Sequence, residues 1–218
     1  MSDQLRLPLK TEGTVRAGVF VRSQCNEAAA SELDRWPDGA GRVMAICGPA
    51  GCGKSRLAAT WAERVGAIGL NGGEAALMDP LELEGRPVLL DIARDADDET
   101  LFHLINLAQQ DGGALLMVSR PSPRLWGVAL PDLRSRLDAV RVIAMDPPDD
   151  VVLAAILRTR FSELSITPGD EVIDYLVRRI DRSAAAAAEV VARLDAQHRP
   201  VTRALARQVL DLSNELFD

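Results

Sequence analysis

Residues 42–61 read RVMAICGPAGCGKSRLAATW, and this segment sets the class of the fold. It opens with a short apolar run typical of a buried strand and closes, from Lys54 onward, with the composition of a helix. Between them, residues 48–55 match the pattern G-x-x-x-x-G-K-[ST] at every defined position. The order strand, glycine-rich loop, helix is the context of a phosphate-binding loop. The sequence therefore predicts a P-loop nucleotide site.

The residue types of this loop suit phosphate chemistry. Gly48, Gly51 and Gly53 allow backbone N–H groups to converge on phosphate oxygens, and the N-terminus of the following helix adds its positive dipole. Lys54 reaches the terminal phosphates, and the hydroxyl of Ser55 is a ligand for Mg²⁺. The remaining members of the predicted nucleotide site are Pro49, Ala50, Cys52, Arg56, Asp91 and Ser119.

Strands and helices alternate along the first two thirds of the chain. Five short apolar runs are strand candidates, at residues 42–47, 67–70, 87–92, 114–119 and 140–145. A helix is expected over 23–36, and residues 97–110 have helical periodicity. Strands that alternate with helices predict a parallel sheet covered on both faces. We therefore expect an α/β fold with a five-stranded parallel sheet.

After residue 150 the strand signals stop. Four helical candidates follow, at residues 151–164, 169–180, 183–197 and 201–216. This change predicts a small all-helical lid domain after the α/β body. The expected division is a tail and linker at 1–22, a nucleotide-binding domain at 23–147 and the helical domain at 148–218.

The third strand candidate bears on whether the site hydrolyses nucleotide. Asp91 ends this strand and is placed to hold Mg²⁺ together with Ser55. The next residue is Ile92, whose alkyl side chain can neither accept a proton nor orient water. Asp95, Asp97 and Asp98 lie further on and are interpreted as a solvated acidic loop that caps the next helix, with a displaced catalytic base as the alternative. We expect the chain to hold nucleotide better than it turns it over.

Composition excludes several other classes of protein. The 218 residues carry a net charge of -7, which argues against a surface that neutralises DNA phosphates. No apolar run approaches the length of a membrane span, and no secretory signal is seen. Three cysteines and two histidines show neither a disulfide framework nor metal-ligand spacing. These features are typical of a cytoplasmic globular protein.

The assembled motifs resemble the AAA+ ATPases of the bacterial replication-initiator (DnaA) clade, in particular the short Hda-type members that inactivate the initiator. The N-terminal hexapeptide QLRLPL, with Gln4, Leu5, Leu7, Pro8 and Leu9, matches their QLxLPL motif at all fixed positions. That motif binds the sliding clamp, the β subunit of DNA polymerase III. Pro8 stiffens an extended segment, so leucine side chains can enter a groove with little ordering cost. A frayed terminus or an edge strand is the alternative interpretation.

The resemblance also assigns roles to residues in the body. LPDLRSRLDAV, residues 130–140, is similar to the segment that carries the arginine finger, which falls on Arg136 and would act in trans on a neighbouring subunit. The alternative is that Arg134, Arg136 and Arg141 form a solvated basic face. VSRPSP, residues 118–123, resembles the end of the sensor strand, with Ser119 beside the phosphate. Residues 20–26 occupy the place where the family's backbone surrounds the adenine.

Two positions depart from the family pattern. RRIDRSAAAAAEVV, residues 178–191, keeps the frame of the motif whose arginine contacts the nucleotide from the lid, but the matching residue is Ala185. Either Arg182 substitutes for it, or the lid contact is absent. The second departure is Ile92. Both favour ADP, or a site that discriminates loosely between ADP and ATP, over an active ATPase.

The resemblance implies a negative regulator of replication initiation. It would bind adenine nucleotide and Mg²⁺, dock on the clamp and promote hydrolysis of initiator-bound ATP, with the initiator DnaA as its partner and without direct reading of DNA sequence. The alternatives are a self-sufficient P-loop ATPase or remodeller, a DNA-bound loading factor that the acidic charge disfavours, and a diverged paralogue that docks on the clamp without activating the initiator ATPase. Head-to-tail self-association is also expected to be accessible to such a chain.

Overall fold

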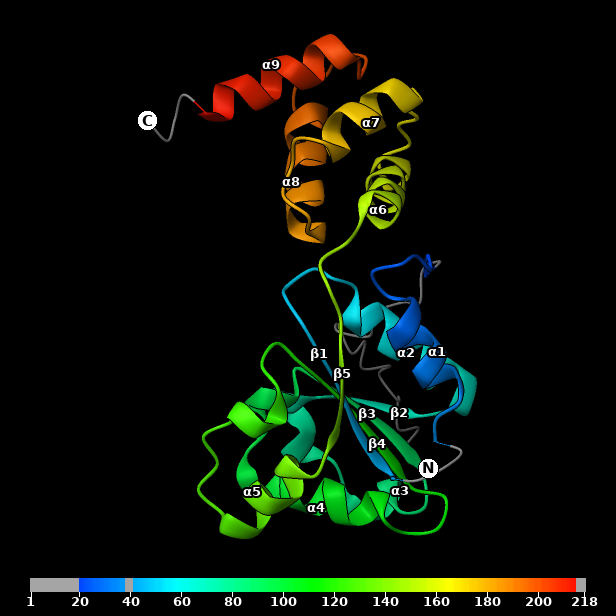
Figure 1. Cartoon of the computed structure of the whole chain (residues 1–218), viewed down its shortest axis with the longest axis vertical. Helices are drawn as coiled ribbons and strands as arrows, with labels where there is room; N and C mark the ends of the chain where they lie inside the picture. Colours follow the sequence, from blue (N-terminus) through cyan, green and yellow to red (C-terminus); the bar gives the residue numbers. More distant parts are fainter. Residues whose placement is uncertain (1–19, 38–40, 215–218) are drawn as a thin grey trace, which may run out of the picture.

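A five-stranded parallel sheet forms the centre of the molecule (Figure 1). The computed structural model describes residues 20–37 and 41–214, so the hexapeptide at 4–9 lies outside the described residues. The strand order is β2-β3-β4-β1-β5, and every neighbouring pair is parallel. The bounds are β1 Val43–Cys47, β2 Ile68–Asn71, β3 Pro87–Asp91, β4 Ala114–Ser119 and β5 Arg141–Ala144. The expected sheet is confirmed, and each strand lies within two residues of its predicted limits.

Helices cover both faces of this sheet. Successive side chains of a strand point to opposite sides, and here the side chains on both sides are apolar and need to be covered. On β1, Met44 and Ile46 pack against α1 Glu27–Asp34 and α2 Lys54–Val65. Ala45 and Cys47 face the opposite layer. That layer contains η1 Gly72–Leu77, α3 Pro80–Leu83, η2 Ala93–Asp95, α4 Asp98–Ala108, η3 Pro123–Leu125 and α5 Pro131–Asp138. The sheet and these helices form the body of the molecule.

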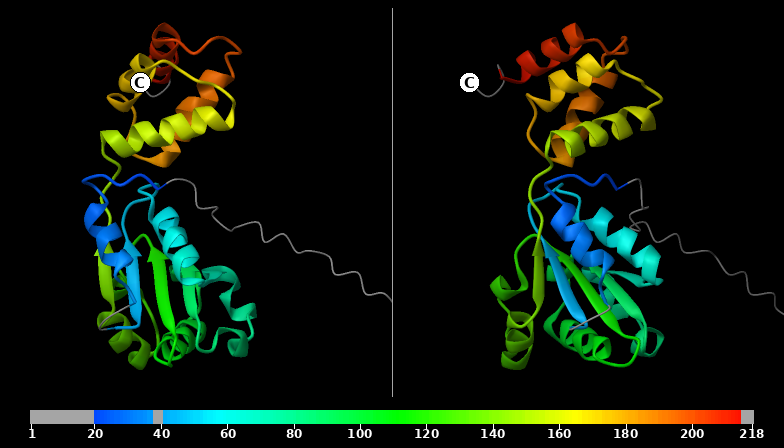
Figure 2. Two further views of the ribbon diagram at one scale, coloured as in Figure 1. Left: turned by 90° about the vertical axis from the view of Figure 1, so that its right-hand side faces the viewer. Right: turned by 45° about the vertical axis from the view of Figure 1, so that its right-hand side comes forward.

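A second unit, here called the helical unit, follows β5. It consists of α6 Asp150–Glu163, α7 Asp170–Val177, α8 Ala184–Asp195 and α9 Arg203–Asn214. These helices share a core of their own, in which Leu153, Leu157 and Phe161 of α6 are fully buried. Figure 2 shows the unit next to the body, with the chain running from β5 into α6. The all-helical end of the fold is thereby confirmed.

Polar caps decide where three of these helices begin. Asp97 accepts a hydrogen bond from the N–H of Thr100 at the start of α4, Asp149 from Val152 at the start of α6, and Ser183 from Ala186 at the start of α8. Such a cap satisfies an N–H group that has no partner within its own helix. The cap on α8 lets the alanine run at 184–188 start a helix, since alanine itself propagates one well.

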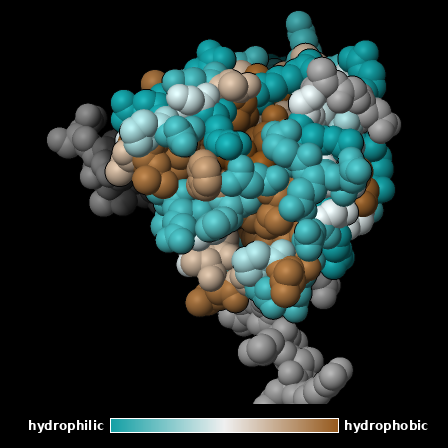
Figure 3. All heavy atoms as spheres, turned by 90° about the horizontal axis from the view of Figure 1, so that it is seen from below, coloured by the Kyte–Doolittle hydropathy of each residue, from teal (hydrophilic) through white to brown (hydrophobic). Residues whose placement is uncertain are grey.

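The end of the body away from the helical unit has a mixed surface. Hydrophobic patches lie between hydrophilic side chains on this face (Figure 3). The segment that contains η1 and α3 exposes Leu77 and Leu81, which are 85% and 76% accessible. In the described residues, no helix combines the length and the apolar character that a bilayer crossing requires. Isolated surface leucines of this kind are ordinary for a globular protein.

Candidate nucleotide site

The loop between β1 and α2 is held in a conformation that requires glycine. Gly51 has φ +73, and a Cβ atom there would lie 2.8 Å from the backbone nitrogen of Ala184. At Gly48 a Cβ atom would lie 2.4 Å from the carbonyl oxygen of Met145. Gly53, with φ +98, is the residue before the first turn of α2. The backbone therefore passes against α8 on one side and the end of β5 on the other, at distances that a side chain would prevent.

Lys54 lies inside this loop and is only 8% exposed. Its Nζ donates to the carbonyl oxygens of Gly48 at 2.9 Å and Pro49 at 2.7 Å, and it contacts Cys52 Sγ at 3.7 Å. These three contacts use the three donors of the ammonium group. The loop is therefore closed around its own cation, and the weak sulfur contact is the one most easily exchanged for a phosphate oxygen.

Ser55 and Asp91 come together from separate elements, as expected for a magnesium site. The Ser55 hydroxyl donates to Asp91 Oδ1 at 3.2 Å, joining the first turn of α2 to the end of β3. A hydroxyl and a carboxylate are the hard oxygen ligands that Mg²⁺ accepts beside water and phosphate, so the donor set fits this ion. The following residue, Ile92, is 48% exposed and has a left-handed backbone with φ 51. It presents an alkyl group where a second carboxylate would be needed to activate water.

A cavity of about 310 Å³ lies between this loop and the helical unit. The body contributes Gly51, Cys52, Gly53, Lys54, Ser55 and Arg56, and the residues before α1 contribute Phe20, Val21 and Asn26. The helical unit contributes Val152, Ala155, Ile156, Thr159, Arg160 and Ala184. One end of the cavity is therefore rich in backbone N–H groups and positive charge, and the remainder is largely apolar. This combination suits a ligand with a phosphate group and a flat, weakly polar body.

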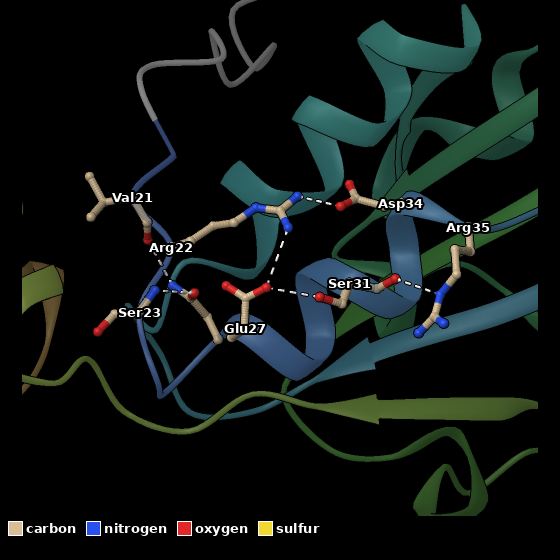
Figure 4. Close-up of polar contacts among 8 residues, drawn as sticks. Val21, Arg22, Ser23, Glu27, Ser31, Asp34 and Arg35 are labelled. Carbon is tan, nitrogen blue, oxygen red and sulfur yellow. Dashed lines mark hydrogen bonds and ion pairs between the residues drawn. The ribbon is translucent and has the colours of Figure 1, made fainter.

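The segment before α1 is folded by a buried amide. Asn26 is 3% exposed; its Oδ1 accepts from the N–H of Ser23, and its Nδ2 donates to the carbonyl oxygen of Val21, both at 3.0 Å. Arg22 lies across α1 and pairs with Glu27 and Asp34, as Figure 4 shows. The Asn26 side chain bonds within this turn and makes no capping bond to α1. Because residues 24–26 form the turn, α1 begins at Glu27, later than the predicted residue 23. The turn brings Phe20 and Val21 to the cavity.

Asp149 joins this segment to the helical unit. Its carboxylate caps α6 and also accepts from the Ser23 hydroxyl and from the N–H of Cys25 at 3.4 Å. Burial by itself would raise the pKa of Asp149, but the hydrogen bonds from Ser23 and Val152 outweigh it and hold the pKa below its usual value. The charged carboxylate thus fixes the first turn of α6 against the segment that lines the cavity.

The helical unit contacts the P loop directly, through the start of α8. The N–H of Ala184 donates to the carbonyl oxygen of Gly51 at 3.3 Å. Ala185, at the position where the family carries an arginine, is exposed. Arg182 pairs with Asp150 at 2.6 Å and donates to the carbonyl oxygen of Pro148, and it is not among the residues that line the cavity. Of the two sequence interpretations, the structure therefore gives no support to substitution by Arg182.

Two further predicted site residues, Ser119 and Arg136, lie on different parts of the body. Ser119 ends β4 opposite Cys47, is 5% exposed and donates to the carbonyl oxygen of Pro121 at 2.6 Å. Burial raises the pKa of the Cys47 thiol next to it.

Arg136 is on α5, at the end of the body away from the helical unit (Figure 1), with its guanidinium 4.9 Å from the ring centre of Phe102. It is exposed there, on a different part of the body from the cavity in its own chain.

Sequence reasoning missed the contribution of α6. Arg160, Thr159 and Ile156 line the cavity, although apolar residues are spread around α6 and its pattern marks no separate binding face. The one available signal is the spacing of Val152, Ala155, Ile156 and Thr159, which lie on one helix face three to four residues apart. That spacing also describes a face turned to the core, so it does not single out a binding surface.

The fold and the site together define a class. A parallel β2-β3-β4-β1-β5 sheet with a P loop after β1 and a helical unit after β5 is the AAA+ type of P-loop fold.

Comparison with known proteins finds sequence similarity to replication initiators. No model of a protein family matches the chain. The chain is 30% identical over 121 residues to the chromosomal replication initiator protein DnaA of Thermomicrobium roseum, an alignment that covers 54% of this chain and 26% of that protein. It is 31% identical over 87 residues to DnaA of Chloroflexus aggregans, covering 40% and 18%. The chain is thus similar in sequence to DnaA, and it spans about a fifth to a quarter of the length of these two relatives.

The fold agrees with this similarity. Domain III of Thermotoga maritima DnaA superposes with a TM-score of 0.70 at 18% identity, covering 88% of this chain and 93% of that one. AMPPCP-bound DnaA from Aquifex aeolicus gives a TM-score of 0.61 at 15% identity, covering 81% and 63%. The latter structure contains an analogue of ATP. These two matches show that the body and the helical unit together have the AAA+ architecture.

Proposed function

We propose that this chain is an adenine nucleotide-binding regulator of replication initiation of the Hda type. It holds ADP or ATP with Mg²⁺ in the cavity, docks on the sliding clamp through residues 4–9 and offers Arg136 to ATP bound by the initiator. The observation that carries the first part is the cavity between the P loop and the helical unit, with Lys54, Ser55 and Asp91 at one end.

Nucleotide binding is supported by the arrangement of donors. The loop N–H groups and the start of α2 form an anion site, and Lys54 needs to exchange only its contact with Cys52 to reach a phosphate. The exposed Ala185 and the position of Arg182 remove two cations that would favour a third phosphate. We therefore propose that ADP binds about as tightly as ATP.

Isothermal titration with ADP and ATP tests this proposal. The purified chain is expected to bind both nucleotides with dissociation constants within a few-fold of each other. Lys54→Ala removes the cation of the loop and should weaken both. Absence of binding by the wild-type chain, or equal binding by Lys54→Ala, would refute the assignment of this site. Chromatography of the nucleotide released from the purified protein identifies the resident ligand.

The regulatory part of the proposal rests on two further features. The hexapeptide at 4–9 has the composition of a clamp-binding motif, and Arg136 is an exposed guanidinium that faces away from its own cavity. A cation in this position can complete the catalytic site of a neighbouring subunit and stabilise the charge on the transferred phosphoryl group. The similarity to DnaA makes an initiator of that family the natural recipient.

Two sets of variants separate clamp docking from activation. A double variant Gln4→Ala, Leu7→Ala should lose retention on immobilised clamp. Arg136→Ala should keep that retention and lose stimulation of initiator ATPase. Arg134→Ala makes the same change of charge two residues earlier on α5, about half a turn round the helix, and should keep both. Stimulation that survives in Arg136→Ala would remove the arginine-finger assignment.

A self-sufficient ATPase is the second candidate, favoured by the complete P loop alone. Its activity would require a residue that activates water, and Ile92 offers none next to Asp91. Rapid hydrolysis by the isolated chain, lost in Lys54→Ala, would establish this alternative.

A further inference from the structure

The cavity receives positive charge from two directions. Lys54 and Arg56 reach it from the start of α2, on the body. Within residues 20–37 and 41–214, the one cationic side chain that the helical unit places on its wall is Arg160, near the end of α6. Its other contributions are uncharged: Val152, Ala155, Ile156, Thr159 and Ala184. Arg160 is thus a cation that the helical unit adds to an anion site formed by the body.

Arg160 is held by an interaction that a phosphate can replace. Its NH1 donates to Glu163 Oε2 at 3.0 Å, three residues further along the same helix. The two side chains are 42% and 51% exposed, and an ion pair with this exposure contributes only about 0–1 kcal/mol. A guanidinium has five N–H donors in a planar fork that matches phosphate oxygens, and the bond to Glu163 uses NH1.

We propose that Arg160 is the phosphate-binding cation of the helical unit. On nucleotide binding its guanidinium leaves Glu163 for a phosphate oxygen, and this bond draws α6 toward the P loop. The inference rests on the proposed nucleotide binding and names a residue that the P-loop motif does not contain. Phosphate, and not the base, is the expected partner of Arg160. The apolar lining from Phe20, Val21 and Ile156 suits the uncharged ring of the base, whereas a guanidinium binds phosphate oxygens.

A bond from Arg160 to phosphate would act on α6 far from the point where this helix is attached to the body. It lies ten residues beyond Asp150, the first residue of α6, which is about 15 Å along the helix at 1.5 Å per residue. The start of α6 is fixed to the body through Asp149. Leu157 and Phe161 on the same helix are fully buried in the shared core of the helical unit. A pull on Arg160 therefore moves the unit as one piece, because its core does not deform easily.

The decisive experiment measures affinity for ADP and for adenosine in matched variants. Arg160→Ala alone would leave the Glu163 carboxylate beside an anionic ligand, so the double variant Arg160→Ala, Glu163→Gln is compared with Glu163→Gln. We expect ADP to bind about ten- to a hundred-fold more weakly in the double variant, the range for loss of a hydrogen bond to a charged group. Adenosine affinity, measured by competition, should change less than about twofold, since adenosine lacks the phosphate.

Arg182→Ala is the matched control, because it removes an arginine of the same unit that pairs with Asp150 outside the cavity lining. Its ADP affinity should remain within about twofold of wild type, and melting curves of all variants verify folding. Unchanged ADP affinity in the double variant, an equal loss for adenosine, or an equal loss in Arg182→Ala would overturn the inference. If Lys54→Ala binds ADP normally, the nucleotide site itself fails; if Lys54→Ala loses ADP and the double variant does not, only the role of Arg160 fails.

Discussion

Replacing Gly51 with alanine tests the contact between the P loop and the helical unit. The motif leaves this position free, so the loop chemistry by itself does not demand glycine. The structure does, because the new Cβ atom would lie 2.8 Å from the backbone nitrogen of Ala184, a group that cannot rotate away. Relief requires α8 to move. Since α8 shares a buried core with α6 and α9, the helical unit moves with it and the cavity widens.

Gly51→Ala is expected to change both the melting temperature and the affinity for ADP, for two separate reasons. A left-handed backbone costs a residue with a Cβ atom about 1–2 kcal/mol, which lowers the melting temperature of a chain of this size by about 2–8 °C. Displacement of α8 also breaks the bond from the Ala184 N–H to the Gly51 carbonyl, which contributes about 0.5–1.5 kcal/mol. That bond forms only when the helical unit lies against the loop, as it does around the cavity. Its loss should therefore weaken ADP binding by up to about tenfold.

Gly66→Ala is a control that has the backbone strain of Gly51→Ala without the clash against α8. Gly66 ends α2 with φ +67, close to the value at Gly51, but no atom lies within 4 Å of its missing Cβ. It should therefore show the loss of melting temperature and keep its affinity for ADP. Calorimetry and isothermal titration on both variants give the comparison. Equal ADP affinities in Gly51→Ala, Gly66→Ala and wild type would refute the closeness of α8 to the loop.

Three further variants test other contacts. Asp149→Asn keeps a capping oxygen but removes the carboxylate charge, so weaker hydrogen bonds from Ser23 and Val152 should lower the melting temperature by about 2–4 °C, for roughly 1 kcal/mol. Because these hydrogen bonds hold the Asp149 pKa below its usual value, the difference should be complete above about pH 4 and vanish as pH falls further; a pH-independent difference would contradict this. Phe161→Ala, fully buried in the helical unit, should cost about 3–5 kcal/mol in urea unfolding, and a cost below 1 kcal/mol would place it outside the core. Ile92→Asn should raise stability by about 1 kcal/mol, since asparagine tolerates the left-handed backbone and Ile92 is half exposed; a lower melting temperature would show that its side chain packs after all.

Much of the architecture is predictable because it depends on local patterns. The runs at 87–92 and 114–119 are apolar on both faces, as a strand between two layers of helices must be, and β3 and β4 are found there. The pairing of Ser55 with Asp91 is also foreseeable, because the P loop follows a parallel strand and the carboxyl ends of parallel strands meet at one edge.

Other parts of the site escape such patterns. Ser23 and Asn26 have the composition of helix caps, yet Ser23 bonds to Asp149, more than a hundred residues away, and Asn26 folds the chain before α1. A capping residue is judged from its neighbours in sequence, whereas the partner of Ser23 is brought close only by folding, and Asn26 bonds backward to Ser23 and Val21 instead of forward into the helix. For that reason the predicted start of α1 was four residues early.

The amino-acid sequence alone determined that this chain has a P loop, an alternating α/β body and a run of helices after it, since glycine spacing and apolar periodicity are properties of neighbouring residues. Only the tertiary structure decided which arginine of the helical unit faces the cavity. Arg160, on α6, lines the cavity, whereas Arg182, in the segment between α7 and α8, pairs with Asp150 and is not part of the lining. The reason is physical: the place that a long charged side chain reaches depends on how its segment packs against the rest of the unit, and that packing depends on every helix of the unit together.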